Sequence, residues 1–381
     1  MKTLKSMKWK HFANYIAVAV ALIVFSSLAL AGALPQSTVY RLEEIAISII
    51  LAVSLSLVVG FLGELSLGHA GFMCVGAYLG GKVSAILVEP LGNGIVTLLI
   101  ALLVGGLCAG VCGFIIGLPA LRLKGDYLAI TTLAFGEIVR TIFMNTSPES
   151  FGGALGLATP RFNKKFFFII CLVMVLVTLA VVQNLIRSKH GRAITAIRDN
   201  EIAARSTGIN VTQYKLTGFI VAAIFAGIAG VLFSYTQSNV SSATFDYNYS
   251  IEILVMVVLG GMGSINGSII AATLITYLNK ELTTVLTGDL AVLKDLVYAL
   301  ILILIVIYNN SPRLAGVREK YNLKNLFKRV TKNRFAEGDD TGRWDVVPTK
   351  IKMDALLSTD FVVNEIKPDK PNGAGEEKDH E

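Results

Sequence analysis

The strongest constraint on the fold is a series of long apolar runs that recurs along most of the chain. Each run is about 17–24 residues long, enough for an α-helix to cross the hydrocarbon core of a bilayer. The runs lack the apolar/polar alternation of transmembrane β-strands, which argues against a barrel. The sequence therefore predicts an all-α, polytopic integral membrane protein.

Hydropathy predicts about ten spans. They fall near residues 13–34, 42–62, 66–88, 94–118, 126–144, 165–186, 214–235, 250–264, 267–286 and 292–308. Only 16% of the 381 residues are charged, whereas a soluble domain of this size carries about a quarter. We expect one transmembrane domain at 13–315, a short N-terminus at 1–12 and a largely disordered tail at 316–381.

Clusters of basic residues predict the orientation. Residues 1–12 carry a net charge of +4, residues 187–215 also carry +4, and residues 309–334 contain eight Arg or Lys against one Glu. Ten spans place all three segments on one side, which the positive-inside rule identifies as cytoplasmic. Both termini are then cytoplasmic, although the basic residues at 161–165 lie on the outer side.

The charged stretch 187–214 carries signals for a short helix near 200–207. Asp199 or Asn200 can accept hydrogen bonds from the free N–H groups at its start. Glu201 in the first turn and Arg205 in the last turn match the helix dipole, and Gly208 suits the left-handed position that follows a helix. The helix is a candidate docking surface, and the alternative is a solvated basic loop.

In this stretch the chain resembles the LivM-type permeases of ABC importers for branched-chain amino acids, in the hydrophobic amino acid uptake family. The similar run is GRAITAIRDNEIAARSTGINVTQYKL. The importer pattern Glu-Ala-Ala-x-x-x-Gly is met by Ala203, Ala204 and Gly208, with Ile202 in the Glu slot and the acid one residue earlier. The resemblance implies a cytoplasmic coupling helix whose ATPase-coupling residues are Arg192, Arg198, Asp199, Glu201, Ala203, Ala204, Arg205 and Gly208.

A glycine-rich segment, GELSLGHAGFMCVGAYLGG at 63–81, suggests close backbone approach or a broken helix. The family shares the run Ser-Leu-Gly-His-Ala-Gly-Phe, so Gly68, His69, Gly71 and Phe72 are pathway candidates. An ionisable residue within a span is a functional candidate, but a neutral His69 bonded to a neighbouring carbonyl is equally consistent. We expect Glu64 to be hydrated near the inner interface.

A second interruption lies at 257–275, where Gly260, Gly261 and Gly263 break an apolar segment. Paired interruptions in the two halves of a transporter point to a pathway between internal repeats. The alternative is that small residues simply let helices pack closely.

A third candidate group lies in GDYLAITTLAFGEIVR at 125–140, which the resemblance also covers. Asp126 can cap the span, and Glu137 can pair with Arg140 on one helix face. Thr131 and Thr132 offer hydroxyls to a cavity, unless each bonds a carbonyl of its own helix.

The sequence lacks the residues for catalysis. It contains no Walker-type phosphate loop and no Ser-His-Asp or Cys-His arrangement with the context of a nucleophile. The four cysteines lie in apolar runs without His or carboxylate neighbours, so we expect no metal and no cofactor. The basic charge reports orientation and contact with anionic lipid rather than nucleic acid. ATP hydrolysis, if it drives this chain, must come from another subunit.

The resemblance implies a permease subunit that moves leucine, isoleucine or valine across the bacterial cytoplasmic membrane by alternating access. Its implied partners are a LivH-like second permease, two LivG/LivF-like cytoplasmic ATPases, an extracytoplasmic binding protein and the bilayer. Urea and amide permeases are similar, and the loop FGGALGLATP departs from the family pattern. A self-sufficient secondary carrier is the alternative of another class, and it would need coupling charges within the membrane.

Overall fold

The computed structural model describes residues 18, 35–160, 164–237, 239–285, 296–297, 299–300 and 303. The expected spans near 13–34 and 292–308 lie almost wholly outside the described residues. The N-terminus and the tail at 316–381 lie outside them altogether. Everything that follows concerns the described part of the chain.

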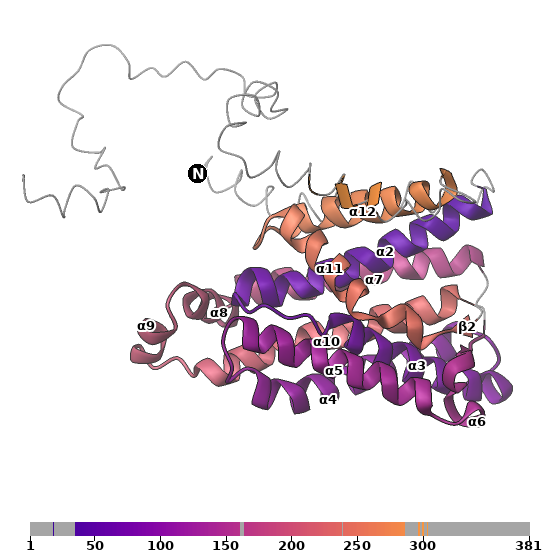
Figure 1. The fold of residues 1–381 in the computed structure, drawn as a ribbon, viewed down its shortest axis with the longest axis horizontal. Helices are drawn as coiled ribbons and strands as arrows, with labels where there is room; N and C mark the ends of the chain where they lie inside the picture. The colour runs from indigo at the N-terminus through magenta and orange to yellow at the C-terminus, as the bar shows by residue number, and fades with distance from the viewer. Residues whose placement is uncertain are drawn as a thin grey trace, which may run out of the picture. The chain divides into compact units, whose positions relative to one another are not determined.

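This part is helical almost throughout (Figure 1). The long helices are α2 (Gln36–Ser56), α3 (His69–Leu91), α4 (Ile95–Ala120), α5 (Asp126–Asn145), α7 (Lys164–Arg187), α10 (Val211–Thr236) and α12 (Ile265–Val285). A π-helical segment, η1 (Leu57–Leu62), continues α2. The shorter helices are α6 (Pro148–Phe151), η2 (Gly153–Leu155), α8 (Lys189–Asp199), α9 (Glu201–Ser206), η3 (Ser242–Phe245) and α11 (Tyr247–Gly260).

Six of the described helices are long and apolar enough to cross a membrane. They are α2 with η1, α3, α4, α5, α7 from Phe166 onward, and α10. They correspond to the expected spans between 42 and 235. The expected span at 250–264 is the 14-residue helix α11, which is apolar but short. Helix α12 is 21 residues long but is not among the six, and the count of ten stays a prediction.

Helices α3, α4 and α10 pack at backbone distance because glycines face one another. A Cβ atom at Gly76 would lie 2.1 Å from the carbonyl oxygen of Gly227, and one at Gly227 would lie 2.7 Å from that of Gly105. Small residues at helix contacts are what membrane bundles use to gain packing contacts. The close backbone approach expected for the segment 63–81 is thus confirmed at Gly76.

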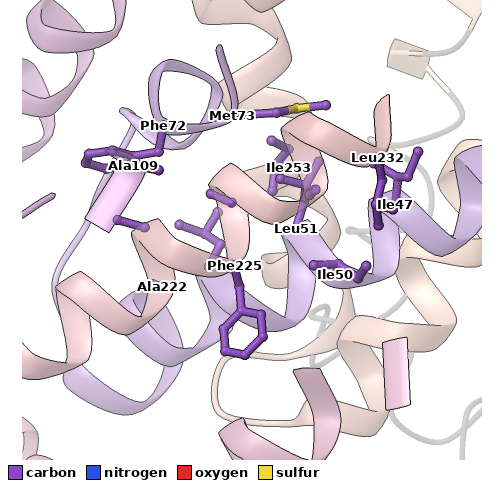
Figure 2. Close-up of a cluster of buried hydrophobic side chains, with 14 of the residues drawn as sticks. Ile47, Ile50, Leu51, Phe72, Met73, Ala109, Ala222, Phe225, Leu232 and Ile253 are labelled. Carbon is purple, nitrogen blue, oxygen red and sulfur yellow. The ribbon is translucent and has the colours of Figure 1, made fainter. Parts of the chain in front are cut away.

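The apolar core lies where α2, α3, α10 and α11 meet. Figure 2 shows Leu51 of α2 and Met73 of α3 in one cluster with Leu232 of α10 and Ile253 of α11. Each of these side chains is buried. The core holds together the helices whose ends carry the polar groups described below.

One short β-ladder departs from the all-α expectation. Strand β1 (Leu157–Ala158) pairs antiparallel with β2 (Asn239–Val240), with Leu157 opposite Val240. It joins the loop FGGALGLATP to the loop after α10. Gly152, Gly153 and Gly156 each have positive φ there, so the loop's glycines are used for tight turns.

Candidate functional site

Helices α8 and α9 form the structured part of the charged stretch. The side-chain oxygen of Asn200 accepts a hydrogen bond of 3.0 Å from the N–H of Ala203, which confirms an N-cap at the expected place. Gly208 has φ +83°, as predicted for the residue after the helix. The preceding helix α8 was not predicted. It is capped by Ser188, whose Oγ accepts from the N–H groups of His190 and Gly191.

A small apolar core holds α8 and α9 together. Ile197, Ala204 and Val211 are buried against one another. Ala204 of the importer pattern therefore packs inward, whereas Ala203 is exposed. Ile202 is also exposed, at 79%, although it is a large apolar residue. One face of α9 is thus buried against the bundle, and the face that carries Ile202 and Ala203 is exposed in the described part of the chain.

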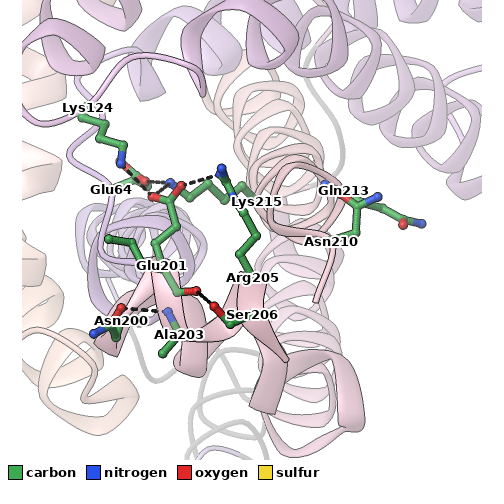
Figure 3. Close-up of polar contacts among 11 residues, drawn as sticks. Glu64, Lys124, Asn200, Glu201, Ala203, Arg205, Ser206, Asn210, Gln213 and Lys215 are labelled. Atoms are coloured by element: carbon green, nitrogen blue, oxygen red, sulfur yellow. Dashed lines mark hydrogen bonds and ion pairs between the residues drawn. The ribbon is translucent and has the colours of Figure 1, made fainter. Parts of the chain in front are cut away.

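Glu201 is the centre of an ionic cluster (Figure 3). Its Oε1 accepts from Arg205 of the same helix at 3.1 Å. Its Oε2 lies 3.3 Å from the Nζ atoms of both Lys124 and Lys215. Lys215 of α10 in turn donates to the carboxylate of Glu64, in the linker between η1 and α3. We call these five residues the Glu201 cluster.

The pair between Lys215 and Glu64 is buried, with 4% and 9% of the two residues exposed. Burying a charge is costly unless a partner of opposite charge compensates it. The expectation that Glu64 is hydrated is therefore wrong, because the folding of the distant 187–215 segment supplies its partner. The result is a fixed connection from α9, through α10, to the linker at 63–68.

The pKa of the Glu201 carboxyl reflects this position outside the membrane-spanning helices. Burial by itself raises the pKa of Glu201, but the positive charges of Lys215 and Lys124 outweigh it. The net effect holds the pKa of Glu201 below its ordinary value of 4.5. The carboxylate is therefore charged, and the cluster is held together, at neutral pH.

Arg198 connects α8 to the end of η1. Its Nη1 donates a 3.0 Å hydrogen bond to the carbonyl oxygen of Gly60, and its Nη2 pairs with Asp199 at 2.9 Å. A Cβ at Gly63 would lie 2.6 Å from Cγ of Arg198, so a side chain there would collide with the arginine. Gly63 also has φ +78°, which favours glycine.

The second glycine-rich interruption packs against η1, next to Arg198. A Cβ at Gly60 would lie 2.4 Å from the backbone nitrogen of Gly263. Helix α11 ends at Gly260, and Gly261 and Gly263 have φ of +90° and +82° before α12 begins. The structure thus places Gly263 of the second interruption against Gly60 of η1. We call Gly60, Gly63, Gly260, Gly261 and Gly263 the glycine junction.

The first turn of α3 packs on α5. A Cβ at Gly68 would lie 2.6 Å from the carbonyl oxygen of Thr132, and one at Gly71 would lie 2.6 Å from Cα of Gly136. Thr132 also accepts a 3.0 Å hydrogen bond from the N–H of Leu67. Phe72 stacks obliquely on Phe135, with ring centroids 4.9 Å apart. These contacts hold the linker at 63–68 in place.

His69 and the polar residues of α5 have local partners. Nε2 of His69 lies 2.8 Å from the hydroxyl of Ser54, and the histidine is buried. The partner of His69 is thus a hydroxyl rather than the carbonyl considered in the sequence analysis, and its role in the pathway stays a prediction. Thr131 bonds the carbonyl of Tyr127 in its own helix at 2.8 Å.

Glu137 and Arg140 form the expected ion pair at 2.8 Å. The second oxygen of Glu137 accepts from the N–H of Tyr247, at the start of α11. Asp126 is not the helix cap, because Gly125 occupies that position and Asp126 is the first helical residue.

The family can now be assigned. The profile of the family described as "Branched-chain amino acid transport system / permease component" matches residues 37–306. The chain belongs to this family. The permease is by family a multi-pass membrane subunit of a transport system rather than a catalytic enzyme.

Relatives support the assignment. Over 311 residues the permease is 35% identical to the high-affinity branched-chain amino acid transport system permease protein LivM of Escherichia coli K12, covering 73% of this chain and 70% of that protein. The LivM protein of Salmonella typhimurium is 36% identical over 309 residues, with the same coverage. The ribose import permease protein RbsC of Escherichia coli K12 is 26% identical over 293 residues, or 71% of this chain and 85% of that one. No solved structure matches the chain.

The sequence predicted helix α9 but not the ion-pair partners of Glu201. Lys215 was counted only as a basic residue of the stretch 187–215. Its convergence with Lys124 on Glu201 depends on the packing of α10 and of the turn before α5. The presence of Glu64 at the start of an apolar segment was the one available signal. Nη1 of Arg192 donates a 3.5 Å hydrogen bond to the carbonyl oxygen of Arg187, and Arg192 stays a predicted coupling residue.

Proposed function

We propose that the permease moves branched-chain amino acids inward across the cytoplasmic membrane as one membrane subunit of an ABC importer. The names of the LivM relatives support leucine, isoleucine and valine as substrates. The proposal includes a LivH-like second permease, two cytoplasmic ATPases and an extracytoplasmic binding protein. ATP hydrolysis belongs to the ATPases, and this chain supplies alternating access.

Helices α8 and α9 dock the ATPase in this proposal. The observation that carries it is the asymmetry of α9. Ala204 and Glu201 tie one side of the helix to the bundle, whereas Ile202 projects from the other. An exposed apolar anchor on a helix with capped ends fits insertion into a groove of a partner. The capped ends keep so short a helix folded without that partner.

Movement of α9 reaches the membrane helices through two rigid contacts. The Glu201 cluster leads to the linker at 63–68, and Arg198 leads to the glycine junction. Buried ion pairs and backbone contacts of this kind transmit displacement because they lack room to absorb it. The ends of α2, α3, α11 and α12 are then displaced together when the ATPases close, which opens the pathway on one side and closes it on the other.

Two variants test the docking step in the assembled complex. Gly208→Val forces a side chain into a left-handed backbone, which costs roughly 1–2 kcal/mol, and should displace α9. Glu201→Lys should break the cluster. Both should lower ATPase co-purification and substrate-stimulated hydrolysis. Gly208→Asn is the matched control, because asparagine tolerates this conformation. Wild-type binding and turnover in both test variants would show that the stretch is only a solvated connector.

Orientation is tested separately. The proposal places α9 and the basic segment 309–334 in the cytoplasm. Reporters fused after Lys215 and after Arg334 should both read cytoplasmic, and an external reading for either would contradict the count of ten spans. A secondary carrier would transport without the ATPases, so uptake by reconstituted vesicles with and without them separates the two classes. Urea offered in the same assay tests the amide alternative.

A further inference from the structure

A polar cavity lies between α2, α10, α11 and α12, and no residue of the Glu201 cluster or the glycine junction lines it. Its volume is about 410 Å³, within the range of roughly 300–1,000 Å³ found for small-molecule sites. Its polar lining includes Tyr40, Glu44, Gln237, Thr276, Asn279 and Lys280. None of these was a candidate from the sequence.

The cavity carries both signs of charge. Nζ of Lys280 lies 2.8 Å from Oε2 of Glu44, which is only 8% exposed. Asn279 donates a 2.9 Å hydrogen bond to Glu252, the second carboxylate of the lining. The Lys280 side chain keeps 41% of its surface exposed, so its ammonium can also bind a group in the cavity.

One buried hydroxyl in the lining has no partner. Oγ1 of Thr276 is inaccessible to solvent and makes no hydrogen bond with any described residue. A buried hydroxyl without a hydrogen bond is costly, by about 1–3 kcal/mol. Thr276 lies one turn before Asn279 and Lys280 on α12, so the three side chains present polar groups to one region.

Part of the lining is apolar. Ile47 of α2 and Met256 of α11 are almost fully buried and line the cavity together with Phe233. An occupant that fits this cavity therefore combines a small charged head of both signs with a compact hydrocarbon part.

The cavity lies within the bundle on the side away from α9. Glu44 is eight residues into α2, or about 12 Å along the helix at 1.5 Å per residue. A neighbouring cavity of about 330 Å³ shares Tyr40 and Lys280 and extends to Gln36, the first residue of α2. The two cavities together reach from the start of α2 toward the middle of the bundle.

Resting on the proposed function, we infer that this cavity binds the zwitterionic amino acid during transport. Lys280 binds the carboxylate, and the Thr276 hydroxyl joins it after rotation about χ1. Glu44 and Glu252 bind the ammonium group, and Ile47 and Met256 contact the aliphatic side chain. An uncharged sugar or urea has no charged group to pair with Lys280 or with Glu44. When no substrate is bound, Glu44 and Lys280 neutralise each other as an ion pair.

The test uses the assembled complex in vesicles, with ATP inside and binding protein outside, and measures leucine uptake. Lys280→Gln and Glu44→Gln should each lower uptake at least tenfold, because each loses one charged hydrogen bond to the substrate. The exchanged pair Glu44→Lys with Lys280→Glu keeps the ion pair between the helices but reverses its polarity. It should restore complex yield and basal ATPase activity but not uptake.

Two matched controls accompany these variants. Glu281→Gln breaks another ion pair between α12 and α2, the one with Arg41, without altering the cavity lining, and should leave uptake near wild type. Thr276→Val should lower uptake several-fold, whereas Thr273→Val, on an exposed hydroxyl bonded to its own helix, should not.

The outcomes separate the inference from the proposed function. Leucine uptake by the wild-type complex with loss in Lys280→Gln and in the exchanged pair supports the cavity. Uptake restored by the exchanged pair, or unchanged in both single variants, overturns it and leaves a structural ion pair. Absence of ATP-dependent leucine uptake in the wild type would instead contradict the proposed function itself.

Discussion

The charged residues near the two ends of the continuous helix α2–η1 have different surroundings. Beyond its η1 end, Glu64 is enclosed by Lys215, which also contacts Glu201 on α9. Toward its start, Glu44 and Lys280 face a cavity of about 410 Å³. A charge that is enclosed by protein partners cannot reach a ligand, so its ion pair can only transmit the movement of one helix to another. A charge that faces a cavity can exchange its partner for a ligand.

The comparison extends to the backbone around each end. At the η1 end the helices touch through glycines, and a Cβ at Gly60 would lie 2.4 Å from Gly263. At the other end larger side chains, Tyr40 and Phe233 among them, stand around open space. Close backbone contact suits transmission of movement, and spaced side chains suit binding. The predictions below test the closed end, from the largest expected effect to the smallest.

Lys215→Met should have the largest effect, because it leaves Glu64 buried without its partner. Breaking one side of a buried pair costs about 3–5 kcal/mol. The thermal unfolding midpoint and the folded yield in detergent should both fall sharply. The double variant Lys215→Met/Glu64→Gln should recover much of the loss, since no unpaired charge remains. A single variant as stable as the wild type would mean that water reaches Glu64 and that the two ends do not differ.

Gly71→Leu should have the next largest effect. Its first side-chain atom would lie 2.6 Å from Cα of Gly136, so α3 and α5 must separate. Overpacking of this kind costs about 1–3 kcal/mol. Leucine uptake should fall while the protein still inserts into the membrane. Gly136→Ala is the matched control, because its Cβ has no neighbour closer than 3.8 Å. Normal uptake in Gly71→Leu would remove this contact from the pathway candidates.

The Glu201 cluster predicts a dependence of stability on pH. The pKa of Glu201 is lower in the folded chain than its ordinary value of 4.5. Its contribution is therefore fully present above 4.5 and is lost as the pH falls through the folded value. The difference in unfolding midpoint between wild type and Glu201→Gln should be constant between about pH 6 and 8 and should shrink in acid. A difference that grows in acid would contradict this assignment.

Arg205→Ala should have the smallest effect. The Arg205 side chain is 70% exposed, and exposed pairs contribute only about 0.2–1 kcal/mol. ATPase co-purification should weaken slightly at low salt and match the wild type at high salt, where the pair is screened. A fall in the thermal unfolding midpoint as large as that of Lys215→Met would show that the exposed and buried partners of Glu201 are equivalent.

The helical elements could be predicted because their signals are local. Apolar runs long enough to span a bilayer predicted the six helices that could cross a membrane. Asn200, Glu201, Arg205 and Gly208 predicted the ends of α9 within one or two residues. Helix α8 was missed because its start at Ser188 follows α7 directly, so a single basic stretch concealed two helix starts. The cap of α5 was misassigned by one residue, from Gly125 to Asp126.

Contacts between distant segments were beyond the sequence. Lys215 reaches Glu64 across 151 positions, and Arg198 reaches Gly60 across 138. Nothing in the local pattern of a lysine or a glycine states which helix will lie beside it. The cavity around Glu44 and Lys280 was missed for the same reason, since its lining comes from α2 and from α10, α11 and α12, which lie far apart in the sequence.

By itself the sequence determined that this chain is a helical membrane protein, where most described helices run, and which family it resembles. Those properties follow from hydrophobic period, capping and motif, each of which acts over a few turns of helix. Only the tertiary structure decided which charges are enclosed and which face a cavity. That distinction depends on what packs around each group, because the cost of a buried charge is set by its partners and its access to water.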